Sequence, residues 1–193
     1  MKEQEIQDFL VNSIEPIEND LYGKKYRASV ILKGNITLPC VAFLDKQTYI
    51  DLAIRRFDES HKQPKKMISA FVTEQNMLNP NEIIRIEQCR NAMPLSLLQK
   101  IQGETLMSWT GFVLKMSDGN CFNFGTSFSF DFFDLPQNYA FSDVVEIINH
   151  SYVDKNGTFK RYRDSWKSAF ENLETLTVYR ELSHFNCYIN SIF

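Results

Sequence analysis

Two pairs of apolar runs, each joined by a short turn sequence, constrain the fold of this chain most strongly. The first pair flanks Gly34-Asn35 in RASVILKGNITLPCVAFL, and the second flanks Asp118-Gly119 between TLMSWTGFVLKM and a phenylalanine-rich stretch. Because glycine and asparagine accept the positive φ of tight turns, each pair predicts a β-hairpin. A chain with two such hairpins is expected to build much of its sheet from antiparallel strands.

The spacing of apolar residues predicts helices before, between and after these hairpins. Residues 3–14 and 95–101 show short helical patterns, and residues 46–57 carry apolar side chains at i, i+3, i+4 and i+7. Asp45 directly precedes the segment 46–57, in a position where aspartate is a favoured helix N-cap. The C-terminal third from Asp164 also predicts a long helix, with apolar or aromatic residues spaced by three and four: Trp166, Ala169, Leu173, Leu176, Tyr179 and Leu182.

These elements predict a single α+β domain over residues 1–193. A mostly antiparallel sheet built from hairpins is expected to pack against flanking helices and the long C-terminal helix. A chain of 193 residues fits one large domain or two small ones. The polar stretch DESHKQPKK, residues 58–66, is the candidate internal hinge.

A row of five phenylalanines occupies even positions between residues 122 and 132, namely Phe122, Phe124, Phe128, Phe130 and Phe132. Alternate residues of a strand face the same side, so the row predicts one apolar face, and a face of that size is normally buried. The intervening Asp131 then faces outward. Phe133 interrupts the alternation beside Asp134, so any contact of this stretch with a partner is expected through Asp131, Phe133 and Asp134.

The sequence lacks the motifs of several common catalytic and ligand-binding sites. The seven glycines are isolated from one another, so no glycine-rich phosphate-binding loop and no G-x-S-x-G nucleophile turn is present. The spacing of histidines and cysteines matches no common metal site, and neither a metal nor a cofactor is expected. His184 and Cys187 would share a helix face, which suits a nucleophilic pair or, as the favoured interpretation, two packing residues.

The segment between Met116 and Lys155 contains no lysine or arginine but several acidic and aromatic residues. Such a segment can steer a basic protein partner by charge and anchor it through aromatic rings. The competing interpretation places each carboxylate in a separate turn or helix start. The predicted partner-binding residues are Asp131, Phe133, Asp134, Tyr139, Asp143 and Glu146.

A short basic stretch is the candidate contact for phosphate or nucleic acid. Lys160, Arg161 and Arg163 alternate with aromatic residues, and on a strand the two arginines would share one face. A solvated edge strand protected by charge has the same pattern. The formal net charge of −3 argues against nucleic acid as the main partner.

The sequence therefore favours a non-enzymatic protein-binding domain. No apolar run is long enough to span a bilayer and the first residues do not resemble a signal peptide, so a cytoplasmic location and no membrane partner are expected. An immunity-like or inhibitor protein of bacterial or phage origin, neutralising a basic partner, fits the acidity and the aromatic content. The first alternative is a small enzyme or ligand-binding protein with a phenylalanine-lined pocket, and the second is nucleic-acid binding through residues 160–163.

Overall fold

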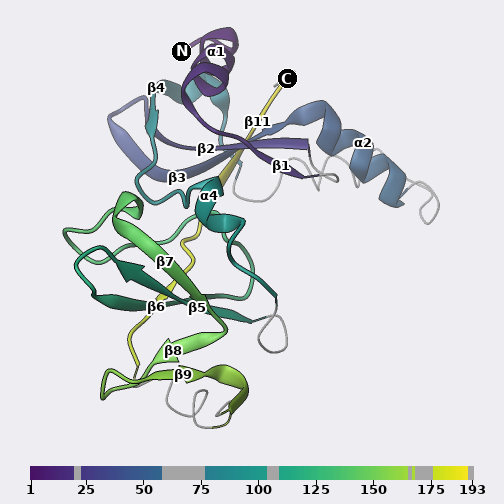
Figure 1. The fold of residues 1–193 in the computed structure, drawn as a ribbon. Coiled ribbons are helices and arrows are strands. Elements are labelled where there is room, and N and C mark those ends of the chain that lie inside the picture. Colours follow the sequence, from purple (N-terminus) through teal and green to yellow (C-terminus); the bar gives the residue numbers. More distant parts are fainter. Residues whose placement is uncertain (20–22, 58–76, 104–108, 165–166, 168–175, 191–193) are drawn as a thin grey trace. The chain divides into compact units, whose positions relative to one another are not determined.

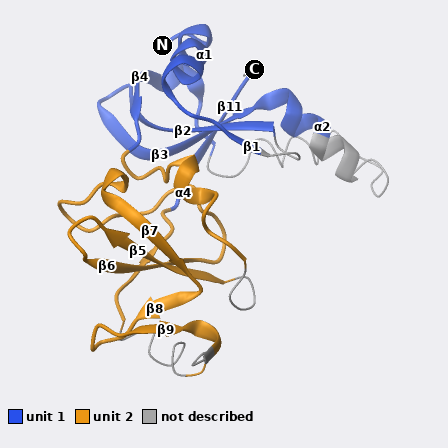
Figure 2. Cartoon of the chain, viewed as in Figure 1, with its two compact units in different colours: residues 1–89, 183–193 blue, residues 90–182 orange. Residues whose placement is uncertain are grey.

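The structure is a computed structural model that describes residues 1–19, 23–57, 77–103, 109–164, 167 and 176–190. The chain divides into two compact units (Figure 2). Unit 1 comprises residues 1–89 and 183–193, and unit 2 comprises residues 90–182. The candidate hinge at 58–66 lies outside the described residues.

The described residues form short helices and many strands (Figure 1). The α-helices are α1 (Glu3–Ser13), α2 (Lys46–Phe57) and α4 (Leu95–Leu98), and the 3-10 turns are η1 (Pro80–Glu82), η2 (Phe141–Asp143) and η3 (Tyr162–Asp164). The strands of unit 1 are β1 (Ile17–Asn19), β2 (Gly23–Leu32), β3 (Ile36–Asp45), β4 (Ile83–Gln88) and β11 (Phe185–Ile189). The strands of unit 2 are β5 (Thr110–Met116), β6 (Cys121–Thr126), β7 (Val144–Asn149), β8 (Ser151–Val153), β9 (Phe159–Arg161) and β10 (Val178–Arg180).

Unit 1 is built on a sheet in the order β1-β2-β3-β11, with β4 paired to β2 as well. The predicted hairpin between β2 and β3 is confirmed, and Gly34 and Asn35 at its turn have φ values of 83° and 60°. Helix α1 buries Ile6 and Leu10 in the core of this unit, together with Phe43 of β3. The predicted N-cap of α2 is also confirmed, because the Asp45 carboxylate accepts a hydrogen bond from the N–H of Thr48 at 2.7 Å.

Unit 2 contains a sheet in the order β10-β6-β5-β7 and a separate β8–β9 hairpin. The predicted hairpin between β5 and β6 is confirmed, and Asp118 in its turn accepts a hydrogen bond from the N–H of Asn120 at 2.9 Å. The core of this unit centres on the rings of Phe112, Phe124 and Phe133, whose centroids lie 5.7 to 5.8 Å apart. Each of these three rings is fully buried.

The predicted fold class is wrong in two respects. The described part of the chain is mostly sheet, and it shows no long C-terminal helix. Residues 178–180 and 185–189 form β10 and β11, while residues 168–175 lie outside the described part. Both strands pair in parallel, β10 with β6 and β11 with β3, so the sheets are mixed rather than mostly antiparallel.

Pairing with β3, rather than a regular period of two, makes residues 185–189 a strand. Cys187 and Ile189 are fully buried in the core of unit 1, but Tyr188 between them is also buried, and Phe185 is exposed. Burial in this segment does not alternate regularly, and the hydrogen bonds to β3 fix it as a strand.

The phenylalanine row does not form one buried face. Strand β6 ends at Thr126, so the alternation of a strand does not extend to Phe128, Phe130 and Phe132. Phe132 is fully buried, whereas the Phe128 side chain is 90% exposed. The expectation that Asp131 and Phe133 face outward is wrong as well, since both are buried.

Candidate functional site

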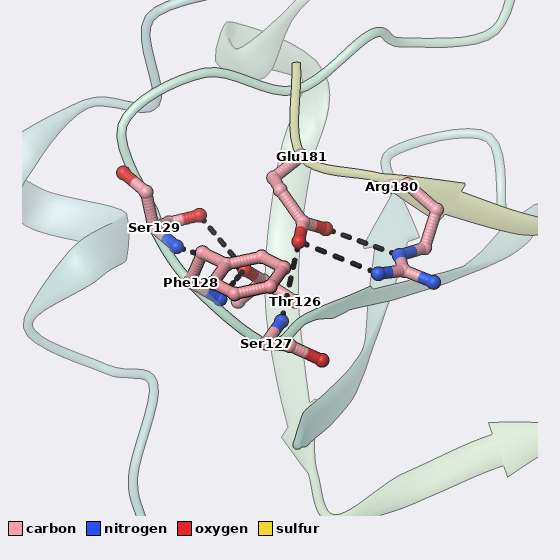
Figure 3. Close-up of polar contacts among 6 residues, drawn as sticks. All are labelled: Thr126, Ser127, Phe128, Ser129, Arg180 and Glu181. Atoms are coloured by element: carbon pink, nitrogen blue, oxygen red, sulfur yellow. Dashed lines mark hydrogen bonds and ion pairs between the residues drawn. The ribbon is translucent and has the colours of Figure 1, made fainter. Parts of the chain in front are cut away.

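The most distinctive surface feature of unit 2 is the loop that follows β6. Its Phe128 side chain is 90% exposed, whereas the next most exposed large apolar side chain among the described residues, Val145, is 59% exposed. Figure 3 shows Phe128 between Ser127 and Ser129, with Arg180 and Glu181 close to the loop. We call residues 126–129 the Phe128 loop.

Thr126 fixes the backbone of the Phe128 loop. Its hydroxyl oxygen accepts hydrogen bonds from the N–H groups of Phe128 and Ser129, each at 3.1 Å, and donates to the carbonyl oxygen of Ser129 at 2.9 Å (Figure 3). Threonine forms this kind of local turn because its short side chain reaches backbone groups two and three residues ahead. The Thr126 side chain is itself buried, so its hydroxyl contacts the loop from inside the unit.

A second contact holds the far end of the loop. The Ser129 hydroxyl donates a hydrogen bond to the Asp131 carboxylate at 2.5 Å, and the backbone N–H of Asp131 donates back to the hydroxyl at 3.2 Å. Asp131 is 5% exposed, so its carboxylate supports the loop from inside the unit. The loop is therefore braced on both sides of Phe128.

An ion pair at the end of β10, between Arg180 and the next residue Glu181, supports the near end of the loop. The Glu181 carboxylate accepts a hydrogen bond from the backbone N–H of Ser127 at 3.3 Å and pairs with the Arg180 guanidinium at 3.0 Å (Figure 3). Partial burial raises the pKa of Glu181, but the hydrogen bonds from Arg180 and from the backbone of Glu181 and Ser127 outweigh burial, so the pKa lies below its ordinary value. Glu181 is thus held as a carboxylate that can accept these bonds.

Arg180 is oriented by an aromatic ring. Its guanidinium carbon lies 4.5 Å from the centroid of the Trp109 ring, which is a cation–π contact. The parallel pairing of β10 with β6 places Arg180 opposite Gly125. A Cβ atom at Gly125 would lie 2.1 Å from Cζ2 of Trp109, so the ring occupies space that only glycine leaves free.

The residues predicted to bind a partner do not form one exposed group. Asp131 and Phe133 are buried, and Asp134 is exposed, with its carboxylate 3.3 Å from the side-chain nitrogen of Asn91. Tyr139 is half-buried, and its hydroxyl donates to the Asp118 carboxylate at 2.7 Å. That hydrogen bond is the main cause that lowers the pKa of Asp118.

The remaining predicted carboxylates have local partners. Asp143 accepts a hydrogen bond from the backbone N–H of Ala140 at 2.8 Å, at the start of η2. Glu146 pairs with Lys115 at 3.4 Å on the neighbouring strand. These contacts match the competing interpretation, in which each acid serves a turn, a helix start or a strand pair.

The basic stretch does not present one face of a strand. Lys160 and Arg161 lie in β9, but β9 ends there and Arg163 lies in η3. All three side chains are exposed, and Lys160 pairs with Asp154 at 3.4 Å. The expectation that Arg161 and Arg163 share a strand face is therefore wrong.

The cysteine and histidine pair is unsuited to nucleophilic chemistry. Cys187 is fully buried, and burial raises the pKa of its thiol to about 12. A thiol with that pKa stays protonated, so it lacks the thiolate that a nucleophile needs. The described residues contain no group of three or more histidine, cysteine or carboxylate side chains positioned to hold a metal ion.

Comparisons with known proteins give no functional lead. No protein-family model, no curated protein and no solved structure matches this chain. Within the part of the chain that the structure describes, no helix has the length and apolar character that a membrane crossing requires.

The alternation of phenylalanines does not reveal the Phe128 loop, because it predicts one continuous strand through Phe128. The TSFS sequence at 126–129 carries a usable signal, since threonine and serine three residues apart favour a local turn. The contribution of Arg180 and Glu181 cannot be predicted from such a local pattern. Glu181 lies 54 positions along the chain from Ser127, the loop residue that it contacts.

We expect Thr126→Val to loosen the Phe128 loop without unfolding unit 2. The substitution keeps the shape of the side chain but removes three hydrogen bonds, and water can reach the exposed end of the loop to replace part of them. The expected loss of unfolding free energy is about 1–2 kcal/mol, measured by urea denaturation. Amide hydrogen exchange at Phe128 and Ser129 should accelerate.

Thr110→Val is the matched control for this change. Thr110 is also buried, but its hydroxyl makes a hydrogen bond to the carbonyl of Gly103 and none to the Phe128 loop. Exchange at Phe128 and Ser129 should remain at the wild-type rate in this variant. Equal acceleration in both variants would show that Thr126 does not brace the loop specifically.

Proposed function

We propose that this protein is a non-enzymatic protein-binding domain whose contact surface centres on Phe128. The observation that carries the proposal is a 90% exposed phenylalanine on a loop whose backbone is held by the hydrogen bonds of Thr126 and Glu181. Leaving such a ring in water costs free energy that burial against a partner would recover, about 2 kcal/mol for a phenylalanine.

Pre-organisation of the loop strengthens this proposal. A flexible loop loses conformational entropy when it docks, and that loss reduces affinity. The Phe128 loop is already ordered by contacts on both sides of the ring, so the ring can act as an anchor at lower entropic cost. Single aromatic anchors of this kind often supply a large share of the binding energy of an interface.

The surroundings of Phe128 indicate what its partner must offer. The ring requires an apolar pocket, and the half-buried Ser127 and Ser129 beside it can form hydrogen bonds at the edge of that pocket. The acidic segment from Ser117 to Asp154, which includes the exposed Asp134 and Glu146, adds long-range attraction for a basic protein. An immunity-like or inhibitor role in the cytoplasm, in which the domain neutralises a basic partner, is the form of the proposal that uses all of these features.

Site-specific photo-crosslinking tests the proposal. We would place the photoreactive p-benzoylphenylalanine at position 128 in cells that naturally make the protein, and identify crosslinked species by mass spectrometry. A discrete protein adduct is expected at 128. Phe128→Ser should then weaken binding of the purified partner by roughly 30-fold or more, which corresponds to about 2 kcal/mol for the loss of an anchor.

Phe159 provides the matched control position. It lies in β9 of the same unit and is 47% exposed, so a probe there reports nonspecific crosslinking of an exposed ring. The proposal predicts no adduct at 159 and unchanged partner binding by Phe159→Ser. An adduct of equal yield at both positions, or unchanged affinity after Phe128→Ser, would contradict the proposed site.

A further inference from the structure

We propose that unit 1 contains a binding site for a small organic anion that carries a flat ring and a hydrogen-bond donor. The site is a cavity of about 430 Å³ lined by residues of α1, α2, η1 and β11 and by residues next to them. Cavities of roughly 300–1,000 Å³ are typical of small-molecule sites. The proposal does not depend on the Phe128 loop, which belongs to the other unit.

The apolar lining of the cavity can accommodate a ring of the ligand. Tyr188 of β11 is 8% exposed, and its ring centroid lies 4.9 Å from that of Tyr49, which holds it in place. Met77 and Pro80 contribute further apolar lining. An aromatic residue and a methionine in the lining favour a flat ligand, because ring stacking and sulfur contacts both reward planarity. No phenylalanine lines the cavity, so it is not the phenylalanine-lined pocket considered from the sequence.

The cavity also contains a positive charge with no ion-pair partner among the described residues. Lys46, the first residue of α2, lines the cavity and is exposed. The nearby Tyr188 hydroxyl adds no negative charge, because burial raises the pKa of Tyr188 and the hydroxyl remains protonated. An ammonium group in this position favours a carboxylate or phosphate on the ligand.

Two asparagines also line the cavity and can offer hydrogen-bond donors. The Asn79 side-chain oxygen accepts a hydrogen bond from the backbone N–H of Asn81 at 3.0 Å, which fixes the Asn79 amide and leaves its nitrogen available to a ligand. The Asn81 side chain also lines the cavity, and among the described residues it has no hydrogen-bond partner. Available amide groups of this kind can bind the edge of a polar ring or the oxygens of its anionic group.

The Glu3 carboxylate requires a hydrogen-bond donor on the ligand. One oxygen of its carboxylate accepts hydrogen bonds from the backbone N–H of Asn190 at 2.6 Å and from the Asn190 side chain at 3.0 Å. The other oxygen has no hydrogen-bond partner among the described residues, although Glu3 lines the cavity. A carboxylate oxygen only accepts hydrogen bonds, so the ligand must supply a donor such as an amine or a hydroxyl.

These requirements are met by two sources of the same chemistry. Nucleoside monophosphates carry a flat base with donors and a phosphate, and aminobenzoates carry a flat ring, an amine and a carboxylate. A titration of the full-length protein with each class, followed by ligand-observed NMR and calorimetry, distinguishes them. Saturable binding by one class, with the matching nucleoside or aniline lacking the anion binding at least tenfold more weakly, is the expected result.

Substitution of Lys46 tests the site directly. Lys46→Gln removes the charge and is expected to weaken ligand binding by roughly 10-fold to 100-fold, the range for loss of a charge-assisted hydrogen bond. Asn81→Ala should weaken it less, because a neutral donor contributes less than a charged one. Circular dichroism and urea denaturation would confirm that both variants remain folded.

Lys33→Gln is the control, because it makes the same change of charge in the same unit. Lys33 pairs with Glu82 at 3.4 Å and does not line the cavity, so its substitution should leave ligand affinity unchanged. The proposal is overturned if neither class binds saturably, if inorganic phosphate alone binds as tightly as the ring-bearing anions, or if Lys46→Gln and Lys33→Gln bind ligand equally.

Discussion

Phe133→Ala is expected to lower the free energy of unfolding of unit 2 by about 3–5 kcal/mol. Phe133 is fully buried, and its ring centroid lies 5.8 Å from that of Phe112 and 5.7 Å from that of Phe124. Alanine would remove this ring from the centre of the core and leave a cavity among close-packed aromatic side chains. Urea denaturation followed by circular dichroism measures the loss.

Phe128→Ala is the matched substitution at the surface. The same atoms are removed, but the Phe128 side chain is 90% exposed, so the unfolding free energy should change by less than about 0.5 kcal/mol. The pair therefore separates a ring that holds the core together from a ring that is available to a partner. Similar losses for the two variants would show that the Phe128 ring packs against the unit in solution.

Gly125→Ala is expected to destabilise unit 2 by about 2–3 kcal/mol through steric overlap in a packed interior. The added Cβ would lie 2.1 Å from Cζ2 of Trp109 and 2.8 Å from Cη2, which is far inside van der Waals contact. Trp109 must move to relieve the overlap, and its contact with Arg180 is then lost. Urea denaturation measures the loss, and a red shift of tryptophan fluorescence reports exposure of the indole.

Gly119→Ala controls for the general effect of replacing a glycine. A Cβ at Gly119 meets nothing within 4 Å, but this glycine has a φ of 89°, so alanine there carries only backbone strain of roughly 1–2 kcal/mol. It should leave the fluorescence maximum unchanged. If Gly125→Ala also leaves the maximum unchanged, the close approach of Trp109 to the Gly125 backbone is not maintained in solution.

Local sequence signals predicted local structure well. The turns at Gly34-Asn35 and Asp118-Gly119 and the Asp45 cap each depend on residues within a few positions, and each is present in the structure. Such features have physical causes that short sequence windows contain: a permitted positive φ, or a side-chain oxygen close to a free N–H.

Features that depend on distant partners were not predictable in this way. Strand β11 becomes a strand because β3 offers it a parallel edge, and nothing within residues 185–189 identifies that edge. The exposure of Phe128 depends similarly on where β6 ends, and the end of β6 was hidden by a run of alternating phenylalanines. Period-two patterning predicts which side chains share a face only while the strand continues.

In the candidate site, too, local contacts follow from the sequence and contacts between distant residues do not. The bonds from Thr126 to the next residues follow from its sequence position, whereas the support from Glu181 requires β10 to lie beside β6. The burial of Asp131 and Phe133 also required the three-dimensional structure, because both lie outside regular strands, where no periodicity assigns a direction to a side chain.

The pairing of β11 with β3 has a consequence for the order in which the chain folds during synthesis. Unit 1 is made from residues 1–89 and 183–193, so the whole of unit 2 is synthesised before β11 can join the sheet of unit 1. Unit 2 is continuous in sequence and can complete its own core first, which reverses the usual order in which N-terminal units fold first. Until β11 emerges from the ribosome, the apolar core residues that contact Cys187 and Ile189 remain uncovered, and unit 1 depends on residues synthesised after unit 2 to complete its sheet.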